Sequence, residues 1–218
     1  MSELKPFIEV ERGDEDVRRI LRVRTDVVRS QATGRDVQVD RVATANWVNI
    51  VALVRPSDVT PRTLTDWNVL LVRQYRFGSR TFVDEFVAGM VDDGEAAQTA
   101  AVRELREETG YAARDVVIHL GTTLPNPSFM ENQLDTFLLV DVEAKDKPDL
   151  DGNEELEHMV VPVRELDVRL QDGRMQNALG IVAWARTKLY AEMHPEVFDV
   201  ERPQFEASST VKLKKPTL

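Results

Sequence analysis

The sequence predicts an α+β fold, an α/β/α sandwich in which a mixed β-sheet lies between helices. Two observations support this prediction. Segments with the alternation or the β-branched composition of strands come before and after a stretch with helical periodicity, and a second helical stretch follows. This order of strands, helix, strands and helix differs from the regular strand–helix alternation of a doubly wound parallel sheet.

The composition is typical of a globular chain that can bury its own core, with 42% hydrophobic and 30% charged residues among 218. The net charge of −10 argues against nucleic-acid binding, because such a field repels polyanions. Cysteine is absent, which excludes disulfides and zinc–thiolate sites and fits a cytoplasmic protein. No apolar run approaches the ~18 residues of a membrane span, so we expect no membrane insertion.

The first third of the chain consists of predicted strands. Residues 21–28 and 37–42 nearly alternate and are separated by a segment with Gly34, which predicts an antiparallel hairpin. Residues 47–54 and 69–72 are denser apolar runs, typical of strands that are covered on both faces. We therefore expect these two runs at the centre of the sheet.

The periodicity becomes helical between Gly94 and Gly110, where Ala97, Ala101 and Leu105 are spaced four apart. Gly110 stands where a helix usually stops. Three strand-like segments follow, at residues 116–120, 136–142 and 158–161.

A second long helix is predicted over residues 175–193. Its expected buried stripe consists of residues four or three apart: Ala178, Val182, Ala185 and Leu189. Residues 194–218 contain three prolines and a lysine-rich segment, which indicates a peripheral arm or tail. The predicted organisation is a strand region at 1–45, a central domain at 46–193 and an arm or tail at 194–218.

Three glutamates of the first predicted helix are the main candidates for functional residues. Helical geometry places Glu104 and Glu108 one turn apart with Glu107 beside them, so that three carboxylates are expected to converge on one patch. Such a patch repels itself unless a cation is present, and hard cations such as Mg²⁺ or Mn²⁺ prefer several oxygen ligands. A charged helix face of this kind is more often merely solvated.

Residues around these glutamates support a site. Arg103 is four residues before Glu107 and can hold that carboxylate in orientation. Gly89 is expected to let the chain bend sharply before the helix, which would bring a backbone carbonyl near the metal.

The spacing from Gly89 to Tyr111 resembles the Nudix box, Gly-x5-Glu-x7-Arg-Glu-apolar-x-Glu-Glu-x-Gly-apolar, with seven fixed positions matched. Segments outside the box are similar to the ADP-ribose pyrophosphatase branch of that family. They are Arg73-Gln74-Tyr75-Arg76, residues 85–89, Pro125-Asn126-Pro127 and Glu154-x-x-Glu157.

The resemblance implies the Nudix fold, with a mixed sheet, a catalytic helix after the box and an N-terminal antiparallel hairpin. It further implies metal-assisted hydrolysis of a nucleoside diphosphate linked to another group. Glu104, Glu107 and Glu108 would be ligands of two or more Mg²⁺ or Mn²⁺ ions, the Ala88 carbonyl would be a further ligand, and Arg103 would orient them. Glu95 would assist metal binding indirectly, by contacting one of the metal ligands or a water molecule.

The resemblance leaves the general base open between Glu131 and Glu154, with neither as a third option. The position at which the loop version of the pattern expects a glutamate holds Asn132, one residue after Glu131. Glu154 stands eight residues before Pro162, where the other version expects its base.

Four residues are candidates for substrate binding. Arg76 resembles an arginine that grips phosphates or the terminal sugar, although a salt bridge at a strand end is the simpler interpretation. Pro127 stiffens a loop that lies over the sugar in this branch. Phe129 or Trp47 could stack on a base, whereas an aromatic in an apolar strand more often belongs to the core.

The predicted function is hydrolysis of a nucleoside diphosphate sugar, ADP-ribose or related, to a nucleoside monophosphate and a sugar phosphate. The alternatives are a non-catalytic sensor of ADP-ribose-like ligands and a hydrolase of another substrate, such as a dinucleotide or NADH. Members of this branch are commonly homodimers whose N-terminal strands reach across to the partner, and the hairpin is consistent with that arrangement.

Overall fold

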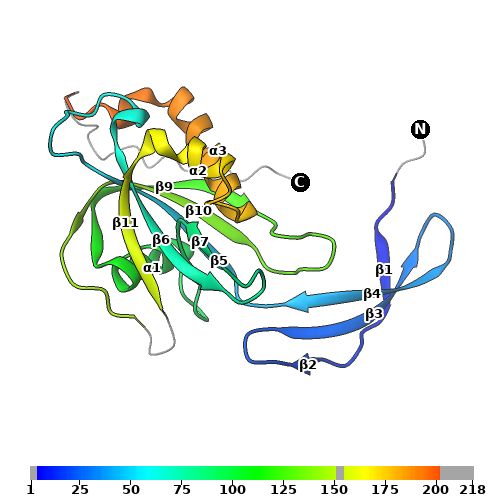
Figure 1. Ribbon diagram of the computed structural model, residues 1–218. Coiled ribbons are helices and arrows are strands. Elements are labelled where there is room, and N and C mark those ends of the chain that lie inside the picture. The colour runs from blue at the N-terminus through cyan, green and yellow to red at the C-terminus, as the bar shows by residue number, and fades with distance from the viewer. Residues whose placement is uncertain (1–3, 151–154, 202–218) are drawn as a thin grey trace.

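The computed structural model describes residues 4–150 and 155–201, which form a globular body and a projecting arm (Figure 1). In the body, a seven-stranded mixed sheet lies between α1 (Ala97–Thr109) on one face and α2 (Leu166–Gln171) and α3 (Ala178–Met193) on the other. The predicted α/β/α sandwich is confirmed.

The arm is a four-stranded sheet that extends away from the body (Figure 1). Its strands are β1 (Phe7–Glu11), β2 (Asp16–Val17), β3 (Arg22–Ser30) and β4 (Asp36–Ala43). β3 pairs antiparallel with each of the other three, and Gly34, with φ +71°, lies in the turn between β3 and β4. The predicted antiparallel hairpin is therefore confirmed.

The body sheet is built around one central strand. Its strands are β5 (Trp47–Val54), β6 (Asn68–Arg76), β7 (Thr81–Glu85), β8 (Val87–Met90), β9 (Tyr111–Thr123), β10 (Leu134–Ala144) and β11 (Leu156–Pro162). β5 runs parallel to β10 and antiparallel to β6 and β8. Because neighbours flank β5 on both edges and helices cover both faces, its dense apolar run is buried, as the sequence predicts.

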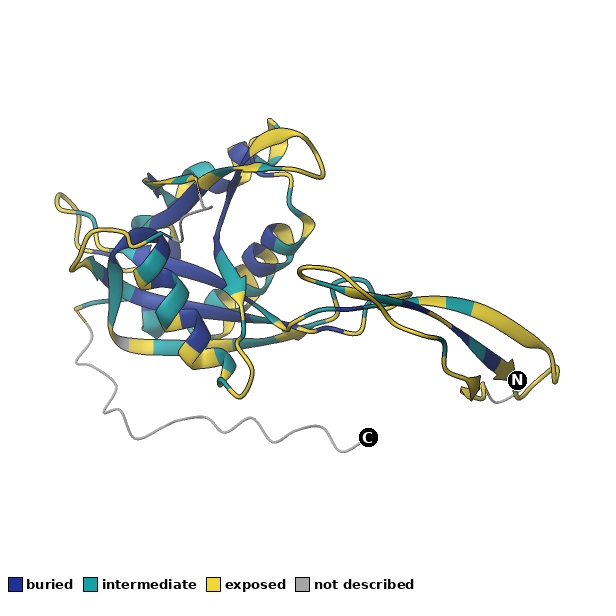
Figure 2. Ribbon diagram, turned by 90° about the horizontal axis from the view of Figure 1, so that it is seen from below, coloured by how far each residue is buried: buried dark blue, intermediate teal, exposed yellow. Residues whose placement is uncertain are grey.

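The alternation of side chains along β5 divides the core into two clusters. Val48, Ile50 and Ala52 pack on the side of α1, whereas Val51 and Leu53 pack on the side of α2 and α3. Figure 2 shows this buried interior between the helices and contrasts it with the largely exposed arm. The two helical layers are therefore held by opposite faces of the same strand.

The helix α1 ends as predicted. Gly110 adopts a left-handed conformation with φ +73°, and its N–H donates to the carbonyl of Arg106 at 2.8 Å. Its carbonyl accepts from the N–H groups of Lys145 and Asp146 at 2.9 and 3.0 Å, which ties the helix end to the chain after β10.

The predicted apolar stripe of α3 is wrong. Ala178, Ala185 and Leu189 are exposed and Val182 is only half-buried. The residues that α3 buries are Gly180, Ala183, Trp184 and Thr187. The helix is apolar on most sides, so periodicity alone did not select a face. The large Trp184 indole settled the choice, since its N–H reaches Asp167 at 2.8 Å while the ring packs in the core.

The start of α3 lies three residues later than predicted. The Asn177 side chain accepts from the N–H of Leu179 at 3.0 Å and so caps the helix. Short 3₁₀ turns complete the structure at η1 (Leu64–Asp66), η2 (Val163–Glu165) and η3 (Pro195–Phe198). None of the described helices combines the length and apolarity that crossing a bilayer requires.

Residues beyond α3 still pack on the body. Phe198 is fully buried, and its carbonyl accepts from the Trp67 indole at 3.0 Å. The N–H of Val200 donates to the carbonyl of Pro61 at 3.1 Å. Trp67 and Trp184 are both core residues. The division of the chain at residue 193 stays a prediction, and residues 202–218 lie outside the described part.

We expect Gly110→Ala to lower the free energy of unfolding by about 2 to 5 kcal/mol. The left-handed conformation costs a non-glycine residue about 1 to 2 kcal/mol, and overpacking adds about 1 to 3 kcal/mol. The new Cβ would lie 2.2 Å from the carbonyl oxygen of Asp146. Urea denaturation followed by circular dichroism measures this change.

The matched control is Gly34→Ala in the arm. Gly34 is also left-handed, but an added Cβ would meet nothing within 4 Å. It should lose only the conformational contribution of about 1 to 2 kcal/mol. Equal losses in the two variants would show that the contact with Asp146 is unimportant.

Candidate active site

The candidate site lies where α1 packs against β8. Gly89 pairs with Val48 in regular antiparallel geometry, so the expected sharp bend at this glycine is wrong. The glycine is needed for a different reason, since a Cβ here would lie 2.0 Å from Cδ of Glu104. The missing side chain of Gly89 therefore leaves the space that the Glu104 carboxylate occupies.

Arg103 joins three carboxylates into one network. Its Nη1 donates to Oε1 of Glu104 and to Oε2 of Glu107, both at 2.9 Å. Its Nε and Nη2 donate to the two oxygens of Glu95 at 3.1 and 3.0 Å, and Nη2 also reaches the carbonyl of Met90 at 3.0 Å. The contact between Arg103 and Glu107 that the sequence predicts is present.

The three box glutamates differ in exposure. Glu107 is 46% exposed at its side chain, whereas Glu104 and Glu108 face inward, with Glu108 buried. In the described part of the chain, no three acidic or histidine side chains form a ready-made metal-ligand group. Glu104 and Glu107 both accept from Nη1 of Arg103, whose charge offsets their repulsion, and the convergence of all three glutamates on a metal stays a prediction.

The residues present nevertheless fit a hard divalent cation. Glu95, Glu104, Glu107 and Glu108 supply carboxylate oxygens with four negative charges, against the single positive charge of Arg103. The Glu104 carboxylate is seated over Gly89 in a space that any other residue would fill with its Cβ. Carboxylate oxygens are the ligands that hard divalent cations prefer.

Arg103 also controls the charge state of its neighbours. Its hydrogen bonds to Glu95 hold the pKa of that carboxyl below its ordinary value, assisted by the N–H of Asp92. The pKa of Arg103 is in turn raised, chiefly by Glu95 and then by Glu107 and Glu104. Glu95 and Arg103 therefore each favour the charged form of the other.

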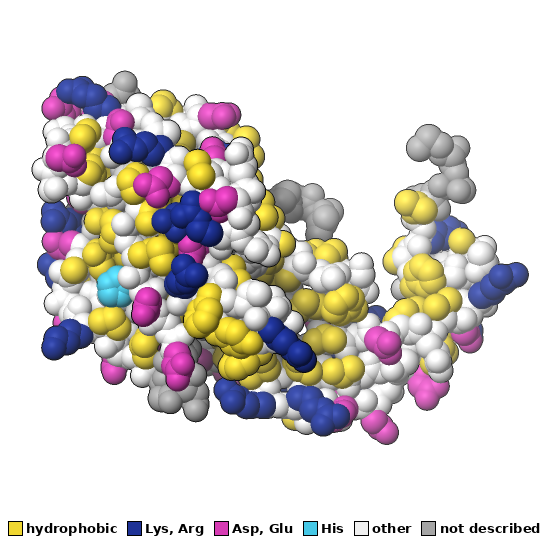
Figure 3. Space-filling view, viewed as in Figure 1, with side chains coloured by type: hydrophobic (Ala, Val, Ile, Leu, Met, Phe, Trp, Pro, Cys, Tyr) yellow, Lys and Arg dark blue, Asp and Glu magenta, His cyan; other side chains and the backbone are white. Residues whose placement is uncertain are grey.

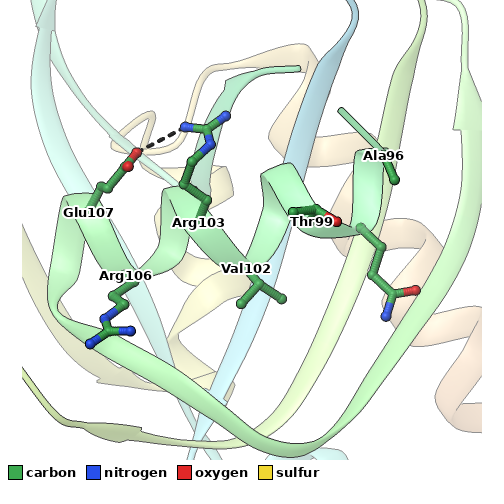
Figure 4. Close-up of a pocket in the computed structure, with 7 residues that line it drawn as sticks. Ala96, Thr99, Val102, Arg103, Arg106 and Glu107 are labelled. Atoms are coloured by element: carbon green, nitrogen blue, oxygen red, sulfur yellow. Dashed lines mark hydrogen bonds and ion pairs between the residues drawn. The ribbon is translucent and has the colours of Figure 1, made fainter. Parts of the chain in front are cut away.

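A hollow of about 680 Å³ lies over the outward side of α1 (Figure 4). It is lined by Ala96, Gln98, Thr99, Val102, Arg103, Arg106 and Glu107. Figure 4 shows the Arg103–Glu107 ion pair at its border. Glu104 and Glu108 do not line this hollow, so it borders the network without containing the inner carboxylates.

Arg76 makes the strand-end salt bridge that the simpler interpretation predicts. Its Nε donates to Oε2 of the buried Glu85 at 2.8 Å, while the Arg76 side chain is itself half-exposed. The second oxygen of Glu85 accepts from Nδ2 of Asn177 at 2.8 Å. Glu85 and Asn177 thus orient the arginine, a role that sequence reasoning missed because 92 residues separate them.

Trp47 and the loop at residues 124–133 lie next to each other at the start of β5. The N–H of Trp47 donates to the carbonyl of Gln133 at 2.8 Å. Trp47 alternates with Val48, which packs toward α1, so the Trp47 side chain lies on the opposite face of the sheet. Pro127 and the exposed Phe129 belong to the same loop. Stacking on a base by Phe129 or Trp47 stays a prediction.

The structure describes only one of the two candidate general bases, Glu131. Glu131 accepts hydrogen bonds from Arg24 and Arg41 of the arm, and these hold its pKa below the ordinary value, Arg24 most strongly. Asn132 is buried at 2% exposure, and neither of its amide atoms has a hydrogen-bond partner among the described residues. Glu154 lies outside the described residues.

A family model for the NUDIX domain matches residues 48–184, which include nearly all of β5, the whole box and the first part of α3. The chain belongs to the Nudix family. Nudix hydrolases in general depend on a divalent metal, in agreement with the oxygen-rich network around Arg103.

Individual relatives agree with this assignment. The chain is 49% identical over 53 residues to an ADP-sugar pyrophosphatase of Mus musculus, a match that covers 24% of each chain. It is 30% identical over 112 residues to an ADP-ribose pyrophosphatase of Bacillus subtilis, covering 50% of this chain and 60% of the relative. The chain therefore spans less than two thirds of the length of these curated relatives.

A solved structure shows the same fold. The crystal structure of an ADP compounds hydrolase superposes with a TM-score of 0.73 over 89% of this Nudix chain and 98% of that chain. The sequences are 20% identical, so the likeness concerns the fold alone.

We expect Gly89→Ala to weaken the binding of Mn²⁺ at least about tenfold, a loss of about 1.4 kcal/mol. The Cβ would overlap Cδ of Glu104 at 2.0 Å and displace that carboxylate. Isothermal titration calorimetry with Mn²⁺ measures the affinity. The control is Gly180→Ala, whose Cβ would meet Phe86 at an ordinary 3.7 Å and should leave the affinity unchanged. An unchanged Mn²⁺ affinity in Gly89→Ala would show that Glu104 is not a metal ligand.

Proposed function

We propose that this Nudix protein hydrolyses the pyrophosphate bond of nucleoside diphosphate sugars, ADP-ribose or related, with a divalent metal. The products would be a nucleoside monophosphate and a sugar phosphate. The observation that carries the proposal is the network of Glu95, Glu104 and Glu107 around Arg103, with Glu104 seated over Gly89. The names of two relatives, an ADP-sugar pyrophosphatase and an ADP-ribose pyrophosphatase, support the substrate class.

In this proposal Glu104, Glu107 and Glu108 hold two or more Mg²⁺ or Mn²⁺ ions, together with the carbonyl of Ala88 beside Gly89. When bound, the metal neutralises phosphate oxygens and lowers the pKa of the attacking water. Arg103 positions Glu104 and Glu107 through its 2.9 Å hydrogen bonds.

The proposed substrate contacts lie around Arg76 and the 124–133 loop. The planar guanidinium of Arg76 suits bidentate contact with phosphate oxygens, and Glu85 holds it at the end of β6. Pro127, Phe129 and Trp47 are proposed to border the sugar or base. The sequence names Glu131 and Glu154 as the candidates for accepting the proton from water.

We expect Mg²⁺-dependent turnover of diphosphate sugars that a chelator abolishes. The assay measures phosphate release, after coupling to a phosphatase, from ADP-ribose, ADP-glucose, GDP-mannose, UDP-glucose, NADH and dATP. Glu104→Gln and Glu108→Gln should each lower turnover by about a thousandfold or more, because each removes a negative charge from the metal-binding network.

Glu192→Gln, on an exposed part of α3, serves as the matched control and should keep full turnover. Near-normal turnover by either box variant would refute the ligand assignment. Turnover confined to NADH or dATP would show that the substrate class is not the diphosphate sugars. Metal-independent binding of ADP-ribose without turnover would indicate a sensor.

We also propose a cytoplasmic homodimer formed through the arm. The arm exposes large apolar side chains, namely Phe7, Ile8, Val10, Val17, Ile20 and Val37. The β6–β7 hairpin of the body exposes the aromatic cluster of Tyr75, Phe77 and Phe82. Figure 3 shows hydrophobic side chains on both the arm and the body near it. Exposed apolar surface of this extent supports a protein partner, and the lack of cysteine fits a reducing compartment.

Sedimentation equilibrium should give about twice the chain mass of 24.8 kDa. The double variant Ile8→Glu with Val17→Glu places charges on the arm and should shift the protein toward monomer. Leu189→Glu, at an exposed position of α3, should leave the mass unchanged. A monomeric wild-type protein would refute the dimer.

A further inference from the structure

The loop at residues 124–133 is joined to the arm by its backbone. The N–H of Val42 in β4 donates to the carbonyl of Phe129 at 2.8 Å, and the N–H of Glu131 donates to the carbonyl of Val42 at 3.0 Å. Val42 and Met130 form a parallel bridge. The loop that carries Pro127 and Phe129 thus forms a short extension of the arm sheet.

Charged side chains reinforce this junction. We call Arg24, Asp26, Arg41 and Glu131 the root cluster. Both arginines contact both carboxylates: Arg24 Nη1 donates to Glu131 at 3.1 Å and Nε to Asp26 at 3.2 Å. Arg41 lies 2.8 Å from Asp26 and 3.4 Å from Glu131. The cluster carries two positive and two negative charges, which balance.

Burial makes each member of the root cluster depend on the others. The Arg24 side chain is 5% exposed and that of Asp26 is 0% exposed. Removing one member would leave the buried charges of the others only partly compensated, because Arg24 has just one further carboxylate nearby among the described residues, that of Glu15 at 3.6 Å. This loss is more costly than that of an exposed ion pair. Three members come from β3 and β4, and Glu131 alone comes from the loop. Glu131 therefore carries the ionic link between the arm and the loop.

The direction of the Glu131 side chain also separates it from proton transfer. Exposure alternates from Glu131 to Thr136, and Asn132 and Leu134 are buried toward the body. Adjacent residues of an extended chain point to opposite sides, so Glu131 faces the arm because Asn132 faces the body. A shift of one residue that turned Glu131 inward would turn Asn132 and Leu134 outward as well.

We propose that Glu131 is a positioning residue that fastens the substrate loop to the arm, and that it is not the general base. This inference rests on the proposed function in one respect, namely that the loop contacts the substrate. The root cluster then transmits the placement of the arm to the loop. Loss of Glu131 loosens the loop and weakens substrate binding, while the chemical step continues.

The experiment compares Glu131→Gln, Arg24→Gln and the double variant. Each should raise KM for the best diphosphate sugar at least about tenfold, with kcat within about threefold of wild type. The double variant should be no worse than either single variant, because the two residues act through one link. Where Arg24→Gln fails to fold, Arg41→Gln replaces it, since Arg41 is the more exposed arginine.

Asp36→Asn is the matched control. Asp36 pairs with Arg29 at 2.6 Å in the same arm, but this exposed pair lies near the β3–β4 turn and does not involve the loop. It should leave KM, kcat and loop exchange unchanged. Amide hydrogen exchange of residues 125–133, measured without substrate, should become faster in Glu131→Gln and in Arg24→Gln.

Two results would overturn the proposal. One is a loss of kcat of a hundredfold or more in Glu131→Gln with KM unchanged and with normal kcat in Arg24→Gln, which is the pattern of a general base. The other is unchanged loop exchange in both variants. If the wild-type protein hydrolyses none of the compounds, the proposed function fails, while the exchange comparison still decides whether Glu131 fastens the loop.

Discussion

The Arg103 guanidinium among Glu95, Glu104 and Glu107 is the interaction on which the rest of the site depends. Four carboxylates close together repel one another, and a helix that carries three of them needs a compensating charge in order to pack. Arg103 supplies that charge from the same helix. The Glu104 carboxylate can lie so close to β8 only because Gly89 has no Cβ. Charge compensation and close packing are therefore joined in one small region.

The central strand explains how this region is held in place. β5 contributes Val48, Ile50 and Ala52 to the cluster that receives α1, and Ala100 and Ala101 of α1 are fully buried against it. Small alanine side chains let the helix axis approach the sheet, which brings Glu104 to Gly89. On the opposite face, Val51 and Leu53 pack with Trp184 of α3. Apolar packing on the two faces of β5 thus positions the site, and the polar residues of the site are not needed for this.

A second balanced group of ions, the root cluster, performs a similar task for the loop. Both groups place guanidinium ions between carboxylates that would otherwise repel one another. Around Arg103 the ion pairs connect α1 to Glu95 in the loop before it, and around Arg24 they connect the arm to the distant 124–133 loop. In the proposed dimer, the apolar arm would then influence the substrate loop through Glu131.

The sequence by itself determined the features that depend on local geometry. The spacing of the box placed Arg103 one turn from Glu107, Gly110 ended α1, and alternation produced the β3–β4 hairpin. These follow from helix pitch, strand pleat and the freedom of glycine. Only the tertiary structure decided that α3 buries Trp184 rather than Leu189, that Gly89 accommodates Glu104, and that Glu131 meets Arg24 across 107 residues. Such partners are selected by packing and charge balance between distant segments, which a local pattern does not record.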